Sequence, residues 1–312
     1  MAGIAEPVSL SHPIVFVLGA GASATYGFPL GTELKQRMLG HLNRKAEVRM
    51  AKLGFDKELV SAFRESLKYS QHATIDIFLE HKTNFRELGS YLIASTIMPL
   101  EVADNLFSKR DWYWDLYKML RFDQEEPRVD MLGVVTLNYE RSFEHFMTKT
   151  IDFNVHQKYV DAAHAKRTQM RIIHAHGSLG AYPDVPYGIN PDNETALRQA
   201  AQSIKIVSDT LDNSPDFRAA QELIAGAENV IFLGFGFNGR TLNALLRNVD
   251  MRRTRFFGTA VKLQQPAKEQ LNQSFNSRFV LGGENQDCAA FLRYIGVCRI
   301  NRHRRLEQPA HG

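Results

Sequence analysis

Short runs of apolar and β-branched residues recur at wide intervals along the chain, and each ends in glycine or a polar turn. The runs cover residues 14–18, 132–137, 171–175, 229–235 and 255–262. Because their apolar positions are consecutive and do not alternate with polar ones, they are typical of strands buried on both faces of a parallel sheet. The pattern predicts an α/β fold with a Rossmann-like parallel sheet flanked by helices.

The residues between the first two predicted strands show helical periodicity. Leu34, Met38, Leu39 and Leu42 form one apolar stripe, and similar stretches follow at 56–70, 83–98 and 111–122. A helical region of roughly a hundred residues is too long for a simple crossover between parallel strands. We therefore expect one domain over residues 1–312, with a sheet core at 12–30, 129–190 and 229–300 and inserted helical segments at 31–128 and 191–228.

The first predicted strand runs directly into a glycine turn made of Gly19, Ala20, Gly21, Ala22 and Ser23. Glycines at such a turn let a pyrophosphate approach backbone amides at the start of a helix. The spacing satisfies the dinucleotide fingerprint, but the acidic residue expected about twenty residues later is missing, because that region is basic and helical. The turn therefore predicts phosphate binding and argues against the usual hydride-transfer enzyme. A tight turn that holds no ligand is the alternative.

Polar side chains follow two other predicted strands. Asn138 comes directly after the strand at 132–137, where ligands of open parallel sheets bind; its amide can orient a ribose or a water, or it can cap the next helix. His174 and His176 are two residues apart and should share one face of the third strand. His176, beside Gly177, is the candidate general base, with a hydrogen-bonded core imidazole or a metal ligand as alternatives. We expect His174 to be structural.

A second glycine turn, with Gly234, Gly236 and Asn238, follows the strand at 229–235 and adds backbone amides at the same edge of the sheet. Two glycine turns, an asparagine and a histidine at strand ends together predict a ligand site. Asp76 belongs to an apolar-striped helical segment at 73–82, where it can face the cleft or cap the helix. We expect Asp76 to have a structural or supporting role.

Composition narrows the classes of protein that fit. The net charge is +4, and basic clusters at 251–255 and 299–306 suit a solvated helix end and a tail better than a nucleic-acid interface. The two cysteines, Cys288 and Cys298, are too few for a disulfide framework or a four-cysteine zinc site. No apolar run approaches membrane-spanning length, and the first residues lack the features of a signal peptide. We expect a soluble cytoplasmic protein without a metal, a membrane segment or direct nucleic-acid binding.

In this order, the motifs of the chain resemble those of the sirtuin-like superfamily, the silent information regulator two type of NAD-consuming domain. The resemblance rests on GAGAS at 19–23 with Gly27 and Pro29, TIDIFL at 74–79, TLNYE at 136–140, His176-Gly177, and GFGFN at 234–238. The cysteines of the zinc module found in the family's protein deacetylases are absent, and FPLGTELK replaces their PDFR segment. The chain is more similar to the bacterial anti-phage NADase branch, although Glu140 stands where that branch has Asp, and we assign it no catalytic role.

The resemblance implies that the protein cleaves NAD to nicotinamide and ADP-ribose, or a cyclised form, as a regulated NAD-depleting effector in anti-phage defence. It implies catalytic roles for Asn138 and His176. NAD-binding residues would be Gly19, Ala20, Gly21, Ala22, Ser23, Pro29, Thr136, Tyr139, Gly177, Ser178, Gly234, Gly236, Phe237 and Asn238. Implied partners are further copies of the chain and a separate activator or inhibitor, such as a HerA-type ATPase or a short Argonaute. The alternatives are a non-hydrolytic NAD or ADP-ribose sensor or assembly subunit, and an ADP-ribosyl transferase or deacylase.

Overall fold

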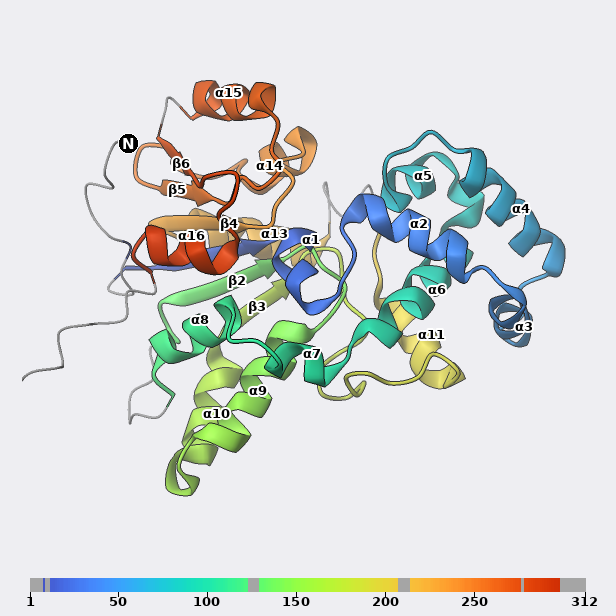
Figure 1. Ribbon diagram of the computed structural model, residues 1–312, viewed down its shortest axis with the longest axis horizontal. Helices are drawn as coiled ribbons and strands as arrows, with labels where there is room; N and C mark the ends of the chain where they lie inside the picture. The colour runs from blue at the N-terminus through green and yellow to red at the C-terminus, as the bar shows by residue number, and fades with distance from the viewer. Residues whose placement is uncertain (1–7, 9–11, 123–128, 207–213, 276–277, 298–312) are drawn as a thin grey trace, which may run out of the picture.

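A parallel β-sheet forms the centre of the computed structural model, which describes residues 8, 12–122, 129–206, 214–275 and 278–297 (Figure 1). Its strands are β1 (Ile14–Leu18), β2 (Leu132–Thr136), β3 (Arg171–His174), β4 (Asn229–Leu233), β5 (Arg255–Gly258) and β6 (Phe279–Leu281). They form a six-stranded sheet in the order β3-β2-β1-β4-β5-β6, and every neighbouring pair is parallel. The predicted α/β class and Rossmann-like sheet are confirmed.

The strand order reverses at β1, which pairs with β2 on one side and with β4 on the other. In sheets of this kind the connections diverge at the reversal and leave a crevice beyond the carboxyl ends of the central strands, where ligands bind. The two predicted glycine turns follow β1 and β4, so the fold places both of them at this crevice.

Helices cover both faces of the sheet and form two apolar clusters. One face is covered by α8 (Trp112–Leu120), α9 (Ser142–Asn154), α10 (Val160–Gln169) and α16 (Cys288–Tyr294). The other is covered by α13 (Pro215–Ala225), α14 (Gly239–Leu245) and α15 (Gln265–Ser274). The alternate side chains of β1 divide between the clusters: Phe16 lies in the first, and Val15 and Val17 lie in the second. Burial on both faces is why the strands are apolar at consecutive positions.

The remaining helices gather in a lobe beside the carboxyl ends of the strands, on the right in Figure 1. They are α2 (Gly31–His41), α3 (Arg44–Lys52), α4 (Lys57–Tyr69), α5 (Ile75–His81), α6 (Arg86–Ile97) and α11 (Glu194–Ser203). Short elements connect the lobe and the sheet: α1 (Ala20–Ser23), η1 (Ala24–Tyr26), η3 (Met98–Leu100) and α7 (Ala103–Phe107). Two further short turns lie within one part each: η2 (Thr83–Phe85) joins α5 to α6 in the lobe, and η4 (Gln157–Tyr159) joins α9 to α10 on the sheet.

The two predicted insertions contribute to both parts of the molecule. From the segment 31–128, α2 to α6 form the lobe, whereas α8 packs on the sheet. From the segment 191–228, α11 packs on α6 in the lobe, whereas α13 packs on β3 and serves as the crossover helix to β4. The lobe is therefore built from both segments, and each also supplies one helix that covers the sheet.

None of the helices in the described parts of the chain combines the length and the apolar character needed to cross a membrane.

Candidate functional site

The two glycine turns pack directly against each other at the end of β1 and β4. The Gly19 amide donates to the Leu233 carbonyl and the Gly21 amide to the Gly234 carbonyl, each at 2.9 Å. A Cβ on Gly234, whose φ is +57°, would lie 1.9 Å from the Ala22 nitrogen. These glycines thus allow two backbones to touch. Two of the amides that we expected to meet a phosphate are bonded to protein carbonyls.

A small cavity of about 100 Å³ opens beside this contact, between the ends of β1 and β2 and the helical lobe. Its wall is made of Ala20, Ser23, Phe28, Pro29, Gly31, Leu34, Asp76, Ile97, Leu137, Asn138, Tyr139 and Glu140. The predicted residues Ala20, Ser23, Pro29, Tyr139 and Asn138, together with Asp76, therefore meet around one space, although the chain brings them from three distant segments. The predicted residues that follow β3 and β4 do not line this cavity.

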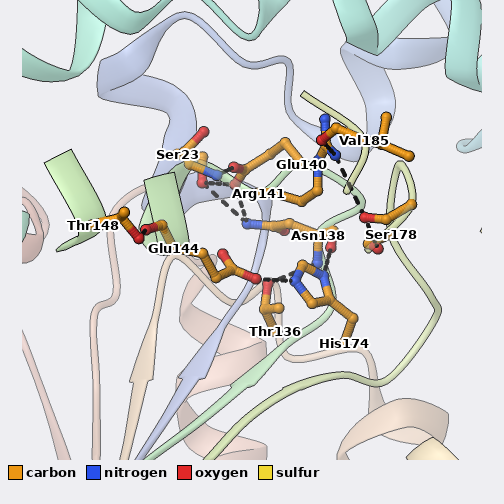
Figure 2. Close-up of polar contacts among 12 residues, drawn as sticks. Ser23, Thr136, Asn138, Glu140, Arg141, Glu144, Thr148, His174, Ser178 and Val185 are labelled. Carbon is orange, nitrogen blue, oxygen red and sulfur yellow. Dashed lines mark hydrogen bonds and ion pairs between the residues drawn. The ribbon is translucent and has the colours of Figure 1, made fainter. Parts of the chain in front are cut away.

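Asn138 lies at the centre of a polar network at the end of β2 (Figure 2). Its side-chain amide donates to the Gly19 carbonyl at 3.2 Å, to the Ser23 hydroxyl at 3.1 Å and to Glu140 Oε1 at 3.4 Å. Its backbone amide donates to the Thr136 hydroxyl at 3.1 Å. The N-cap of α9 is Arg141, so Asn138 does not cap this helix. The asparagine instead ties the first glycine turn to the end of β2.

Glu140 is a residue of the cavity wall to which the sequence analysis gave no role. Its side chain is buried, Oε1 accepts from the Ser23 hydroxyl, and Oε2 accepts from the Ser142 amide at 2.6 Å. Both carboxylate oxygens are thus engaged by neighbouring donors, in addition to the Asn138 contact. The sequence feature that could have indicated a role for Glu140 is its position in the TLNYE segment, two residues after Asn138.

Asp76 reaches the cavity from the first turn of α5. Thr74 is the N-cap of this helix and accepts from the Ile77 amide at 3.4 Å, so Asp76 is not the cap. The Tyr139 hydroxyl donates to Asp76 Oδ1 at 2.9 Å. Burial raises the pKa of the Asp76 carboxyl, while the hydrogen bond from Tyr139 acts in the opposite direction. Burial and the nearby Asp76 raise the pKa of Tyr139 well above its usual value.

The two histidines at the end of β3 lie in different surroundings. His174 Nδ1 is 3.0 Å from the Asn138 carbonyl oxygen, and His174 Nε2 is 2.6 Å from Glu144 Oε1 on α9 (Figure 2). Glu144 raises the pKa of this imidazole against the effect of burial, and His174 in turn lowers the pKa of Glu144. His174 thus links the segment after β2 to α9, which is a structural role.

His176 is on the opposite side of the sheet, stacked on Phe217 of α13 with ring centroids 6.1 Å apart. The expectation that both histidines share one face is wrong, because β3 ends at His174 and a turn carries the next residues across. His176 is 3% exposed, and burial lowers its pKa to about 4. Its imidazole is therefore neutral at pH 7 and lies outside the wall of the cavity.

The absence of a side chain at Gly177 lets another backbone segment approach closely, and it does not open space for a ligand. A Cβ there would lie 1.9 Å from the Ser203 carbonyl oxygen, and its φ is +73°. Gly177 forms a bridge with Ile204, and the His176 carbonyl accepts from the Lys205 amide at 2.9 Å. The Ser178 hydroxyl donates to the Gly180 carbonyl at 3.1 Å. The segment after α11 thus covers the end of β3.

The turn after β4 divides into a packed part and an open part. Phe237, with φ of +51°, joins an aromatic cluster with Phe232, Phe235 and Phe279. The Asn238 side chain caps α14 by accepting from the Arg240 and Thr241 amides at 3.0 and 3.3 Å. Gly236, by contrast, faces open space, since no atom lies within 4 Å of a Cβ built on it. An open surface therefore remains on this side of the crevice.

In the described parts of the chain, no group of three or more His, Cys, Asp or Glu side chains is placed to hold a metal ion. No protein-family model matches the chain, and no curated protein matches it either.

Proposed function

We propose that the protein is an NAD glycohydrolase that releases nicotinamide and ADP-ribose. The observation that supports this most is the cavity at the end of β1 and β2. It joins three segments on which the sirtuin-like resemblance rests: the first glycine turn with Pro29, the helix that carries Asp76, and the segment around Asn138. These segments are separated by many residues in the sequence, and a ligand common to all three gives their meeting a reason.

The lining of the cavity suits the end of NAD that reacts. The nicotinamide ring of oxidised NAD is cationic and leaves as a neutral molecule, so the leaving group needs no proton. Phe28, Leu34 and Ile97 offer apolar surface to a flat ring, while Asp76 and Glu140 are acidic side chains near a developing positive charge on the ribose. Asn138 would orient the ribose or the attacking water.

The size of the cavity limits which part of the ligand it encloses. A volume of about 100 Å³ is well below the roughly 300–1,000 Å³ of sites that enclose a whole drug-sized ligand. We propose that the nicotinamide end occupies the cavity, and that the adenosine end extends past the glycine contact towards the open surface at Gly236. The role of His176 as general base stays a prediction, and its burial does not support a direct contact with ligand in the cavity.

The biological setting follows from the resemblance alone. An NADase that consumes the host's own cofactor must be restrained, so we propose a regulated effector in anti-phage defence that forms homo-oligomers or responds to a separate partner.

A non-hydrolytic NAD or ADP-ribose sensor is the second candidate. Two observations favour it: the small volume of the cavity, and the burial of the histidine that was predicted to act as base. A sensor would bind the dinucleotide stoichiometrically and leave it intact.

Incubation of the purified protein with NAD distinguishes the two candidates. Nicotinamide release should be measured for the wild type and for Asn138→Ala, with Asn243→Ala, a change at an exposed position of α14, as the matched control. We expect catalytic release by the wild type and the control, and a loss of roughly a hundredfold or more in Asn138→Ala. Saturable NAD binding without turnover would contradict the hydrolase proposal and support the sensor.

A further inference from the structure

We infer that the Asp76 carboxylate accepts the proton of the attacking water and that Tyr139 is the positioning residue that holds this carboxylate. The inference rests on the proposed NADase function and names a residue to which the sequence analysis gave only a supporting role.

The placement of Asp76 carries the argument. It lines the cavity from the first turn of α5, and Thr74 already fills the capping position. The bond from the Tyr139 hydroxyl occupies Oδ1 at 2.9 Å. A carboxylate has about four lone-pair sites, so this bond orients the group and leaves it able to accept from a water.

The other titratable side chains near the cavity are committed elsewhere. Both oxygens of Glu140 accept hydrogen bonds, from Ser23 and from the Ser142 amide. His174 is paired with Glu144 and with the Asn138 carbonyl. His176 packs on Phe217 outside the wall. Of the two acidic side chains of the wall, Glu140 accepts three hydrogen bonds from other residues and Asp76 accepts one, so Asp76 has the greater capacity for a reacting water.

The electrostatic setting is favourable for a base. Burial raises the pKa of Asp76, and a carboxylate with a higher pKa accepts a proton more strongly once it is ionised. The Tyr139 hydrogen bond stabilises the charged form and keeps the carboxyl ionised further towards low pH.

The step balances without a further reactant. The water oxygen forms a bond to the anomeric carbon of the nicotinamide ribose while the bond from that carbon to the ring nitrogen breaks. The electron pair of the broken bond stays on nicotinamide, which leaves neutral. The water proton passes to Asp76 and then to solvent, so the products are ADP-ribose, nicotinamide and one proton.

The test compares three variants with the wild type. Asp76→Asn removes the base and keeps the shape of the side chain. Tyr139→Phe removes only the hydroxyl that holds it. Glu80→Gln makes a matched change from carboxylate to amide on the same helix, at a residue paired with Arg240 on the surface and outside the cavity wall. Steady-state nicotinamide release should be followed across pH, with NAD affinity and thermal midpoint measured for each protein.

We expect Asp76→Asn to lower kcat by roughly a hundred- to ten-thousandfold with NAD affinity changed only a few-fold. Tyr139→Phe should move the acidic limb of the pH profile upward by roughly one pH unit, because the donor to the charged carboxylate is lost. A purely structural tyrosine would lower activity at every pH without moving the limb. Glu80→Gln should match the wild type.

Several results would overturn the inference. They are an Asp76→Asn enzyme with normal kcat, an effect on affinity alone, or a Tyr139→Phe profile with an unshifted limb. If the wild type and Asp76→Asn release nicotinamide at equal rates, the proposed NADase function stands and Asp76 is not the base. A wild type that binds NAD and never releases nicotinamide would overturn both.

Discussion

Two histidines that are two residues apart in the sequence lie in opposite halves of this molecule. His174 faces α9, where Glu144 raises its pKa and where it holds the Asn138 carbonyl beside the cavity. His176 faces α13, where burial against Phe217 lowers its pKa to about 4. The difference arises because the strand stops between them. The comparison shows that a histidine near the end of a strand can face either side of the sheet, depending on the residue at which the strand ends.

Gly177→Ala should have the largest effect on this arrangement. The added methyl would meet the Ser203 carbonyl, and the left-handed backbone disfavours any residue with a Cβ. We expect the free energy of unfolding to fall by about 4 kcal/mol in denaturant titrations. Gly236→Ala is the matched control, because its Cβ would meet nothing, and it should change stability by less than about 1 kcal/mol. Equal effects of the two changes would contradict the packed end of β3.

Acidification should reveal the surroundings of His176. Its folded pKa is lowered to about 4, so the unfolded chain binds more protons than the folded protein as the pH falls below about 6.5. Between pH 7 and pH 4 this group should remove about 3 kcal/mol of stability. His176→Phe, which keeps a ring against Phe217, should unfold with a correspondingly flatter pH dependence. An unchanged dependence in this variant would mean that the imidazole is solvated.

Glu144→Gln should have an intermediate effect and the opposite pH signature. The raised pKa of His174 gives stability that is present below about 6.5 and is lost as the pH rises through the folded pKa. The lowered pKa of Glu144 gives stability that is present above about 4.3 and is lost as the pH falls through its folded value. The variant should therefore lose most, about 2 kcal/mol, between these pH values. A loss that is equal at all pH values would argue against an ion pair.

Ser23→Ala should have the smallest effect among these changes. It removes one donor to Glu140 and one acceptor for Asn138, while both partners keep other hydrogen bonds. We expect a loss of about 1 kcal/mol in the free energy of unfolding. A much larger loss would place the centre of the polar network at Ser23 and not at Asn138.

The strand pattern was readable from the sequence because burial on both faces requires consecutive apolar residues. Residues 14–18 and 132–136 form strands within the predicted bounds, whereas β6 was missed, since three residues between turns leave no recognisable run. The meeting of the first glycine turn with Asn138 also followed from the rule that parallel strands end at one edge of the sheet.

Other features depend on contacts that no local pattern encodes. The left-handed turn at Gly177 forms against the segment that follows α11, far along the chain, and His176 lies directly before this contact. Asp76 could be read as a cap until Thr74 was seen to fill that position. The engagement of Glu140 likewise requires Ser23 to lie beside it, which only the folded turn provides.

We propose that NAD is cleaved in the cavity around Asn138. The most direct test is the rate of nicotinamide release from NAD by the wild type and by Asn138→Ala, at equal concentration and with both proteins shown to be folded. We expect turnover by the wild type and a rate at least roughly a hundredfold lower in the variant. Equal rates in the two proteins would contradict it.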